Sequence, residues 1–193
     1  DTLIYTAKRI PEIADDVVNV DNAMKWGFNW DLGPFEILDA LGVASFVARA
    51  DRDGVTLPQW LREVASFYRV EQGKRYYYSL TDKKYREVPL TRGQVSLTLL
   101  KSAAGVVEHN SAASLIDIGD GIFCLEFHSK MNTIGGDTLS MIQKGLRRSE
   151  SDGLGMVIAN EGSLFSAGAN LMLIAMACAE GAWDDLNLTV KSF

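Results

Sequence analysis

The residues best suited to chemistry form one short loop, Phe165-Ser166-Ala167-Gly168-Ala169-Asn170, built almost entirely from small side chains. Such a loop can bring backbone N–H groups close to a ligand, because no bulky side chain separates the main chain from the bound molecule. The N–H of Ala169 could then act as an oxyanion donor, which stabilises the negative charge that grows on an acyl carbonyl oxygen. The same residues would also suit a tight packing turn, and the sequence leaves both interpretations open.

Two predicted elements must position this loop. The apolar run Met156–Ala159 has β-branched residues at its centre and predicts a strand, which residues 160–163 end. The apolar stretch Leu171–Ala179 predicts a helix, whose positive dipole end would face the loop. The order of strand, turn, small-residue loop and helix therefore places the candidate site at a helix N-terminus.

Other chemically capable residues are weaker candidates. His128 could act as a base after a strand, although a structural loop histidine is the simpler interpretation. Lys130 could contact a phosphate group. Ser166 does not fit the nucleophile elbow of serine hydrolases, because Leu164 stands where that motif needs a glycine. The Cys and His residues lack metal-ligand spacing, so no metal site is predicted.

The composition is that of a folded domain protein. The 193 residues are 47% hydrophobic and 23% charged, and the net charge is −6. An acidic chain argues against nucleic-acid binding, which needs a basic face. No apolar run reaches the roughly 18 residues of a membrane span, and no signal-peptide pattern is visible, so we expect a cytoplasmic location. Cys124 and Cys178 lie in apolar runs, so both are predicted to be buried free thiols.

Residues 1–68 are predicted to form an all-helical bundle with short connections. Apolar residues recur at helical spacing over Leu3–Ile10. Asp21 suits the N-cap of a short helix that Gly27 would end. Three further helices are predicted over Pro34–Leu41 before Gly42, over Val43–Ala50, and over Leu57–Phe67, with Thr56 as its cap and Pro58 in its first turn.

After residue 68 the sequence no longer predicts helices alone, and strands and turns are predicted as well. Residues 69–111 are predicted to form a hairpin, with aromatic strands around the polar turn 81–84, and a linker. Residues 112–193 are predicted to form an α/β segment, in which a Gly-Asp-Gly turn at 119–121 closes a hairpin and Asp137 caps a helix. The sequence thus predicts an α+β chain whose last part has too few strands to close its own sheet.

Two stretches resemble known families. Phe165–Leu171 is similar to the F-[SA]-A-G-A-D-[LI] loop of the enoyl-CoA hydratase (crotonase) superfamily, and Glu126–Asn132 falls where that superfamily has its first CoA-contacting loop. Ala23–Phe28 and Leu32–Gly42 resemble the A-M-x-x-G-x-x-x-x-G-P-F-x-x-x-D-x-x-G signature of the 3-hydroxyacyl-CoA dehydrogenase C-terminal helical domain. Together they imply a piece of a bacterial bifunctional fatty-acid β-oxidation enzyme, with an incomplete crotonase-like segment after the helical bundle.

The resemblance implies roles for the loop residues. The N–H of Ala169 would be one of two oxyanion donors for the carbonyl of an acyl-CoA substrate. Lys130 would lie near the CoA phosphates. Asn170 stands where the superfamily has an aspartate, which removes a charge. The residues implied in CoA contact are Lys130, Ser166, Ala167, Gly168 and Asn170.

The resemblance also implies what lies elsewhere. In these families the NAD-binding domain precedes the helical domain, and the second oxyanion donor and the two catalytic glutamates follow the loop. Glu126 and Glu161 precede the loop and do not match those glutamates. We therefore expect a piece of a longer polypeptide, with no cofactor of its own, NAD in the longer enzyme, and little or no turnover in isolation.

The predicted α/β segment should leave an open strand edge and apolar surface, which favour pairing with another chain. We therefore expect a homo-oligomer, with the remainder of a longer chain as a further partner. Two alternatives remain open at this point. The chain could be a non-catalytic scaffold or interaction module, or it could belong to a crotonase-type enoyl-CoA isomerase.

Overall fold

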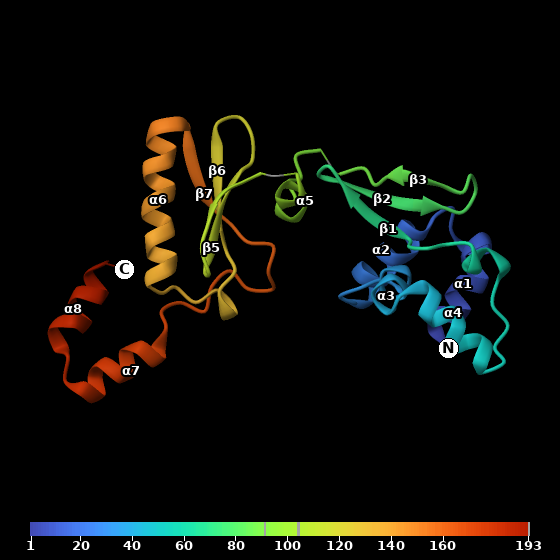
Figure 1. Ribbon diagram of the computed structural model, residues 1–193, viewed down its shortest axis with the longest axis horizontal. Coiled ribbons are helices and arrows are strands. Elements are labelled where there is room, and N and C mark those ends of the chain that lie inside the picture. Colours follow the sequence, from blue (N-terminus) through green and yellow to red (C-terminus); the bar gives the residue numbers. More distant parts are fainter. Residues whose placement is uncertain (91, 104, 193) are drawn as a thin grey trace. The chain divides into compact units, whose positions relative to one another are not determined.

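The computed structural model describes residues 1–90, 92–103 and 105–192, and the chain divides into two compact units (Figure 1). Unit 1 is Asp1–Arg92 and unit 2 is Gly93–Phe193. Unit 1 contains α1 (Thr2–Ile13), α2 (Val17–Phe28), α3 (Pro34–Leu41), α4 (Val43–Arg52), η1 (Gln59–Arg62), β1 (Tyr68–Glu71), β2 (Lys74–Ser79) and β3 (Lys84–Glu87). Unit 2 contains α5 (Leu97–Ser102), β4 (Val106–His109), β5 (Ala113–Asp117), β6 (Ile122–Phe127), η2 (Lys130–Asn132), α6 (Gly136–Asp152), β7 (Gly155–Ile158), α7 (Leu171–Glu180) and α8 (Trp183–Ser192).

The start of α3 is held by a carboxylate from α2. Pro34 occupies the first helical position, where its missing N–H costs nothing. The N-cap residue is Gly33, which has no side chain to cap the helix, so Asp21 does so instead. Asp21 Oδ1 accepts from Phe35 N at 2.8 Å, and Oδ2 accepts from Glu36 N at 3.2 Å. The prediction that Asp21 begins its own short helix was therefore wrong, because tertiary capping of α3 claims its oxygens.

Other boundaries in unit 1 also differ from prediction. Asp16 caps α2 through Asn19 N, and the helix runs past Gly27 to end at Asn29 in the left-handed conformation. The predicted helix over Leu57–Phe67 is reduced to the short 3₁₀ helix η1. Within Leu57–Phe67, the side chains of Leu61 and Phe67 are nevertheless fully buried in the core of unit 1. The helix over Pro34–Leu41 and its end at Gly42, which has a φ of +80°, are as predicted.

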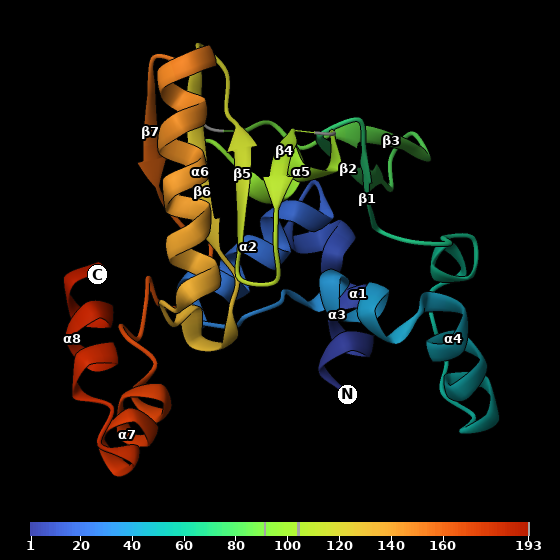
Figure 2. The same cartoon turned by 60° about the vertical axis from the view of Figure 1, so that its left-hand side comes forward.

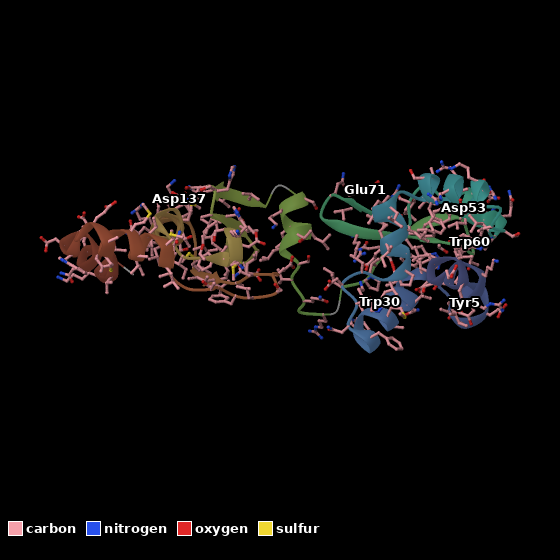
Figure 3. The ribbon with its side chains drawn as sticks, turned by 90° about the horizontal axis from the view of Figure 1, so that it is seen from below. Tyr5, Trp30, Asp53, Trp60, Glu71 and Asp137 are labelled. Carbon is pink, nitrogen blue, oxygen red and sulfur yellow. The ribbon has the colours of Figure 1, made fainter. Side chains whose placement is uncertain are left out.

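The three-stranded sheet β1-β2-β3 belongs to unit 1, with both pairs antiparallel. The predicted hairpin of β2 and β3 is confirmed, whereas β1 was not foreseen. Tyr68, Tyr77 and Tyr78 pack against the helical core, so the division after Arg92 differs from the predicted boundary after residue 68. In that core the ring centroids of Phe35 and Phe67 lie 4.8 Å apart, and Trp60 (labelled in Figure 3) meets Phe67 edge-on.

Unit 2 is built on a four-stranded sheet in the order β4-β5-β6-β7. Strands β4, β5 and β6 pair antiparallel, and β7 pairs parallel to β6 after the crossover through α6. Helix α6 lies along one face of the sheet (Figure 2), where Met141 packs with Leu115 and Leu125. Helix α5 covers part of the other face through Leu97, which packs with Ile116 and Cys124. The predicted hairpin around residues 119–121 and the strand at β7 are confirmed.

The chain therefore combines helices with two sheets, as the α+β prediction required. Helix α6 begins at Gly136 after Gly135, so Asp137 lies in its first turn rather than at its cap. Cys124 is buried as predicted, but the prediction for Cys178 was wrong, since it is exposed on α7. Within the described ranges, no helix has both the length and the apolar character to cross a membrane.

Candidate functional site

The small-residue loop lies between β7 and α7 and is held against the segment before α6. Ile134 N donates to Gly168 O at 2.9 Å, and Ala169 forms a parallel β-bridge with Ile134. Ala167 N donates to Met131 O at 3.1 Å. The two loops that the sequence singled out separately, around residues 130 and 166, therefore lie side by side in unit 2.

Gly168 has a φ of +82°, which a residue with a side chain rarely adopts. Its N–H donates to Ser166 Oγ at 2.9 Å, and that hydroxyl donates to Asn132 O at 2.6 Å. The single donor of the Ser166 hydroxyl is thus used inside the protein. The geometry gives Ser166 a role within the loop, whereas the sequence implied a contact with CoA.

Asn170 forms the N-cap of α7. Its Oδ1 accepts from Met172 N at 3.1 Å, so the side chain satisfies one of the free N–H groups at the helix start. Asparagine and aspartate are about equally good N-cap residues, so α7 can begin at Asn170 without the negative charge of an aspartate. The structure thus gives Asn170 a capping role.

The N–H of Ala169 has no hydrogen-bond acceptor among the described residues. Ala169 is half-buried at a cavity of about 680 Å³, a size that suits a small molecule. The cavity lies between the start of α6 and the pair α7 and α8. Its lining is mostly apolar and consists of Ile134, Gly135, Gly136, Leu139, Ala169, Asn170, Leu173, Ile174, Ala177, Leu186, Thr189 and Val190.

Lys130 and His128 lie at the end of β6. Lys130 begins η2 and is exposed, and its amine forms no ion pair with another described residue. It does not line the cavity, although its loop contacts the small-residue loop through Met131. The Nε2 of His128 lies 2.9 Å from Ser114 Oγ, which supports the structural interpretation of this histidine. No group of His, Cys, Asp and Glu in the described ranges could hold a metal ion.

Glu126 and Glu161, which both precede the loop, hold α5. Glu126 is nearly buried and pairs with Lys101 Nζ at 2.8 Å. Glu161 accepts from Leu97 N at 2.8 Å and from Thr98 N at 3.0 Å. Burial raises the pKa of Glu161, but its hydrogen bonds with Thr98 and Leu97 outweigh burial and lower that pKa. Neither glutamate lines the cavity.

Sequence reasoning missed the role of Asn160, which follows β7. Its Oδ1 accepts from Phe127 N at 2.8 Å, and its Nδ2 donates to Phe165 O at 2.6 Å. Asn132 acts in a similar way, since its Nδ2 donates to Leu164 O at 2.9 Å. The only signal in the sequence was an asparagine directly after a predicted strand, a position where side chains bond to nearby backbone.

Comparison with known proteins places the whole chain beside longer enzymes. All of it is similar, at 41% identity, to a Bacillus subtilis (strain 168) protein named "Probable 3-hydroxyacyl-CoA dehydrogenase", of which it covers 25%. Over 97% of the chain the identity is 28% to a Rickettsia felis protein named "Putative fatty acid oxidation complex trifunctional enzyme", and 24% to one of the same name from Rickettsia prowazekii. The chain spans about a quarter of the length of these relatives. No family model and no solved structure matches it.

Proposed function

We propose that this chain is part of a fatty-acid β-oxidation enzyme that acts on acyl-CoA thioesters, because its relatives are named as a 3-hydroxyacyl-CoA dehydrogenase and as fatty acid oxidation complex enzymes. Unit 2 would bind the thioester as the first part of a crotonase-like domain, and unit 1 would be the helical domain of a 3-hydroxyacyl-CoA dehydrogenase. The longer protein would oxidise 3-hydroxyacyl-CoA with NAD and hydrate enoyl-CoA. The chain itself would contribute the binding of the substrate.

The observation that carries this proposal is that the N–H of Ala169, a residue that lines the apolar cavity, has no acceptor in the part of the chain that the structure describes. A thioester carbonyl placed there would accept this hydrogen bond, while the acyl chain would lie between α6, α7 and α8. A fixed N–H donor in a site that excludes water stabilises an oxyanion more than water does, because no solvent must reorient during the reaction. The apolar lining would contribute roughly 0.8 kcal/mol for each CH₂ group that it buries.

The proposal assigns binding rather than turnover to this chain. Hydration of an enoyl thioester needs a group that activates water and a group that protonates the product. None of the described residues that line the cavity is Asp or Glu, and Glu126 and Glu161 both bind α5. We therefore expect no measurable hydration of crotonyl-CoA by the 193-residue chain.

Calorimetric titration of the chain with octanoyl-CoA and with free CoA tests the proposal. Octanoyl-CoA should bind at least tenfold more tightly than CoA, since only the acyl chain gains the apolar lining. Leu173→Asp places a charge in the lining and should remove this difference. Leu188→Asp is the matched control, because Leu188 lies on α8, is exposed and does not line the cavity. Equal binding of CoA and octanoyl-CoA by the unmodified chain would refute the acyl-binding role.

A second candidate function, that of an interaction module, is favoured by the apolar surface of α7 and α8. Leu171 and Met172 are 75% and 68% exposed, and Trp183 is 62% exposed. Strand β7 lies at an edge of its sheet, with Val157 and Ile158 exposed. Such surfaces favour self-association, so we propose that the chain forms a homo-oligomer. Light scattering over a range of concentrations tests this, and a constant monomer mass would contradict it.

A further inference from the structure

Two side chains that the proposed function leaves unused hold the small-residue loop at two points. Asn160 joins the end of β6 to the start of the loop, through Phe127 N at 2.8 Å and Phe165 O at 2.6 Å. Ser166 joins the middle of the loop to the segment before α6, through Asn132 O at 2.6 Å. Both bonds are made to backbone groups, so they constrain the path of the main chain.

The peptide between Gly168 and Ala169 determines where the free N–H points. In a trans peptide the C=O and the following N–H lie in one plane and point in opposite directions. Ile134 N donates to Gly168 O at 2.9 Å, and this bond turns the Ala169 N–H away from Ile134. The orientation of the donor therefore depends on whatever holds the backbone of Gly168.

Packing does not hold Gly168. A Cβ placed on this residue would meet no atom within 4 Å, so the surrounding space is open. A glycine in open space can rotate between many conformations. The bond from Gly168 N to Ser166 Oγ at 2.9 Å and the bond from Ile134 N to Gly168 O are what select its φ of +82°.

We propose that Ser166 and Asn160 are positioning residues, which aim the N–H of Ala169 at the bound carbonyl without touching the ligand. Ser166 sets the conformation of Gly168, and Asn160 anchors the entry of the loop to β6. This inference rests on the proposed function, since it assigns a cause to the direction of the proposed oxyanion donor. It differs from the implied CoA contact of Ser166, because the hydroxyl donor is already used by Asn132.

The test uses cinnamoyl-CoA, whose conjugated carbonyl absorbs at longer wavelength when its oxygen accepts a hydrogen bond. The unmodified 193-residue chain should shift this absorption to the red on binding. Ser166→Ala should lose most of the red shift while its affinity for free CoA changes less than twofold. Ser166→Thr keeps the hydroxyl and should restore the shift. Ser163→Ala is the matched control, because Ser163 is exposed in the same loop region.

The variant Asn160→Asp tests the second positioning residue. Aspartate keeps the acceptor for Phe127 N and loses the donor to Phe165 O. It should reduce the red shift and should increase the backbone motion of Gly168 and Ala169, measured by NMR relaxation without ligand. Circular dichroism establishes that each variant is folded.

The two proposals fail in different ways. If the unmodified chain binds cinnamoyl-CoA with no red shift, or does not bind it, then the oxyanion role of Ala169 is wrong and the positioning role falls with it. If the unmodified chain shifts the absorption and folded Ser166→Ala and Asn160→Asp shift it equally, only the positioning inference is overturned. Loss of the red shift in Ser163→Ala would also overturn the positioning inference, because Ser163 forms none of the hydrogen bonds assigned to Ser166 and Asn160.

Discussion

Unit 1 and unit 2 both use carboxylates to satisfy backbone N–H groups, but they differ in what is left over. In unit 1, Asp21 caps α3, and Asp39 accepts from Phe67 N and Tyr68 N at 2.7 Å each. In unit 2, Glu161 accepts from the first N–H groups of α5, yet within the described ranges the N–H of Ala169 beside the cavity has no acceptor. These two carboxylates of unit 1 thus satisfy backbone donors of the fold, whereas in unit 2 one backbone donor at the cavity has no acceptor among the described residues.

The two units also differ in the direction in which the fold shifts the pKa of such a carboxylate. Burial raises the pKa of Asp21 to about 6, although hydrogen bonds from Phe35 N and Tyr68 OH act in the opposite direction. Glu161 lies at the surface, and its hydrogen bonds lower its pKa below 4.5. The contributions of Asp21 and Glu161 to stability should therefore respond to pH in opposite directions.

The largest expected effect is that of Gly33→Ala in unit 1. A Cβ at this position would collide with the backbone and side chain of Asp21, which cannot withdraw without releasing α3. The free energy of unfolding should fall by about 3 kcal/mol or more. Urea denaturation followed by tryptophan fluorescence measures this.

Gly27→Ala is the matched control, since a Cβ there would meet nothing within 4 Å and the residue lies within α2. It should raise the stability by up to about 1 kcal/mol, because alanine favours the helix. If both variants lose stability equally, the contact between Gly33 and Asp21 is not what requires a glycine.

Lys101→Met should have the next largest effect, and it acts in unit 2. It would leave the nearly buried carboxylate of Glu126 without its cation. The free energy of unfolding should fall by about 2–3 kcal/mol. This is less than for a fully buried ion pair, because the side chain of Lys101 is about a third exposed. Lys144→Met should cost less than about 0.5 kcal/mol, since Lys144 is exposed and lies 3.7 Å from Glu108. Equal losses, measured by thermal unfolding, would contradict the role given to Glu126.

A pH effect of intermediate size is expected from Asp21. Its pKa is higher in the folded protein than in the unfolded chain, so the folded state holds the proton more tightly between about pH 4 and 6. The free energy of unfolding of unit 1 should therefore fall by about 1–3 kcal/mol as the pH rises through this range. Asp21→Asn should remove this fall, as measured by urea denaturation at each pH, whereas Asp31→Asn in the exposed loop should keep it.

The smallest effect is expected from Glu161→Gln. The lowered pKa means that the stability from Glu161 is present above pH 4.5 and is lost as the pH falls. At pH 7 the variant should lose about 0.5–1 kcal/mol, and the amides of Leu97 and Thr98 should exchange hydrogen faster. Glu180→Gln at the exposed end of α7 is the control. Unchanged exchange at Leu97 and Thr98 would show that Glu161 does not stabilise α5.

Local patterns were sufficient where one short stretch decides the structure. The helix from Pro34, the hairpin around residues 119–121, and the strand and helix on both sides of the small-residue loop were all predicted from spacing and turn residues. The candidate loop was predicted from its small side chains alone. The prediction was wrong for Asp21 and for Leu57–Phe67, because distant partners outweigh local capping and apolar spacing there.

The sequence by itself determined the elements and the place of the loop, since propensity, turn chemistry and small side chains act over a few residues. Only the tertiary structure decided which groups the loop has free. The hydroxyl of Ser166 donates to Asn132 and the carboxylate of Glu161 holds α5, whereas the N–H of Ala169 has no acceptor among the residues described. The physical reason is that these hydrogen bonds join segments far apart in the sequence, which come within about 3 Å of each other only in the folded chain.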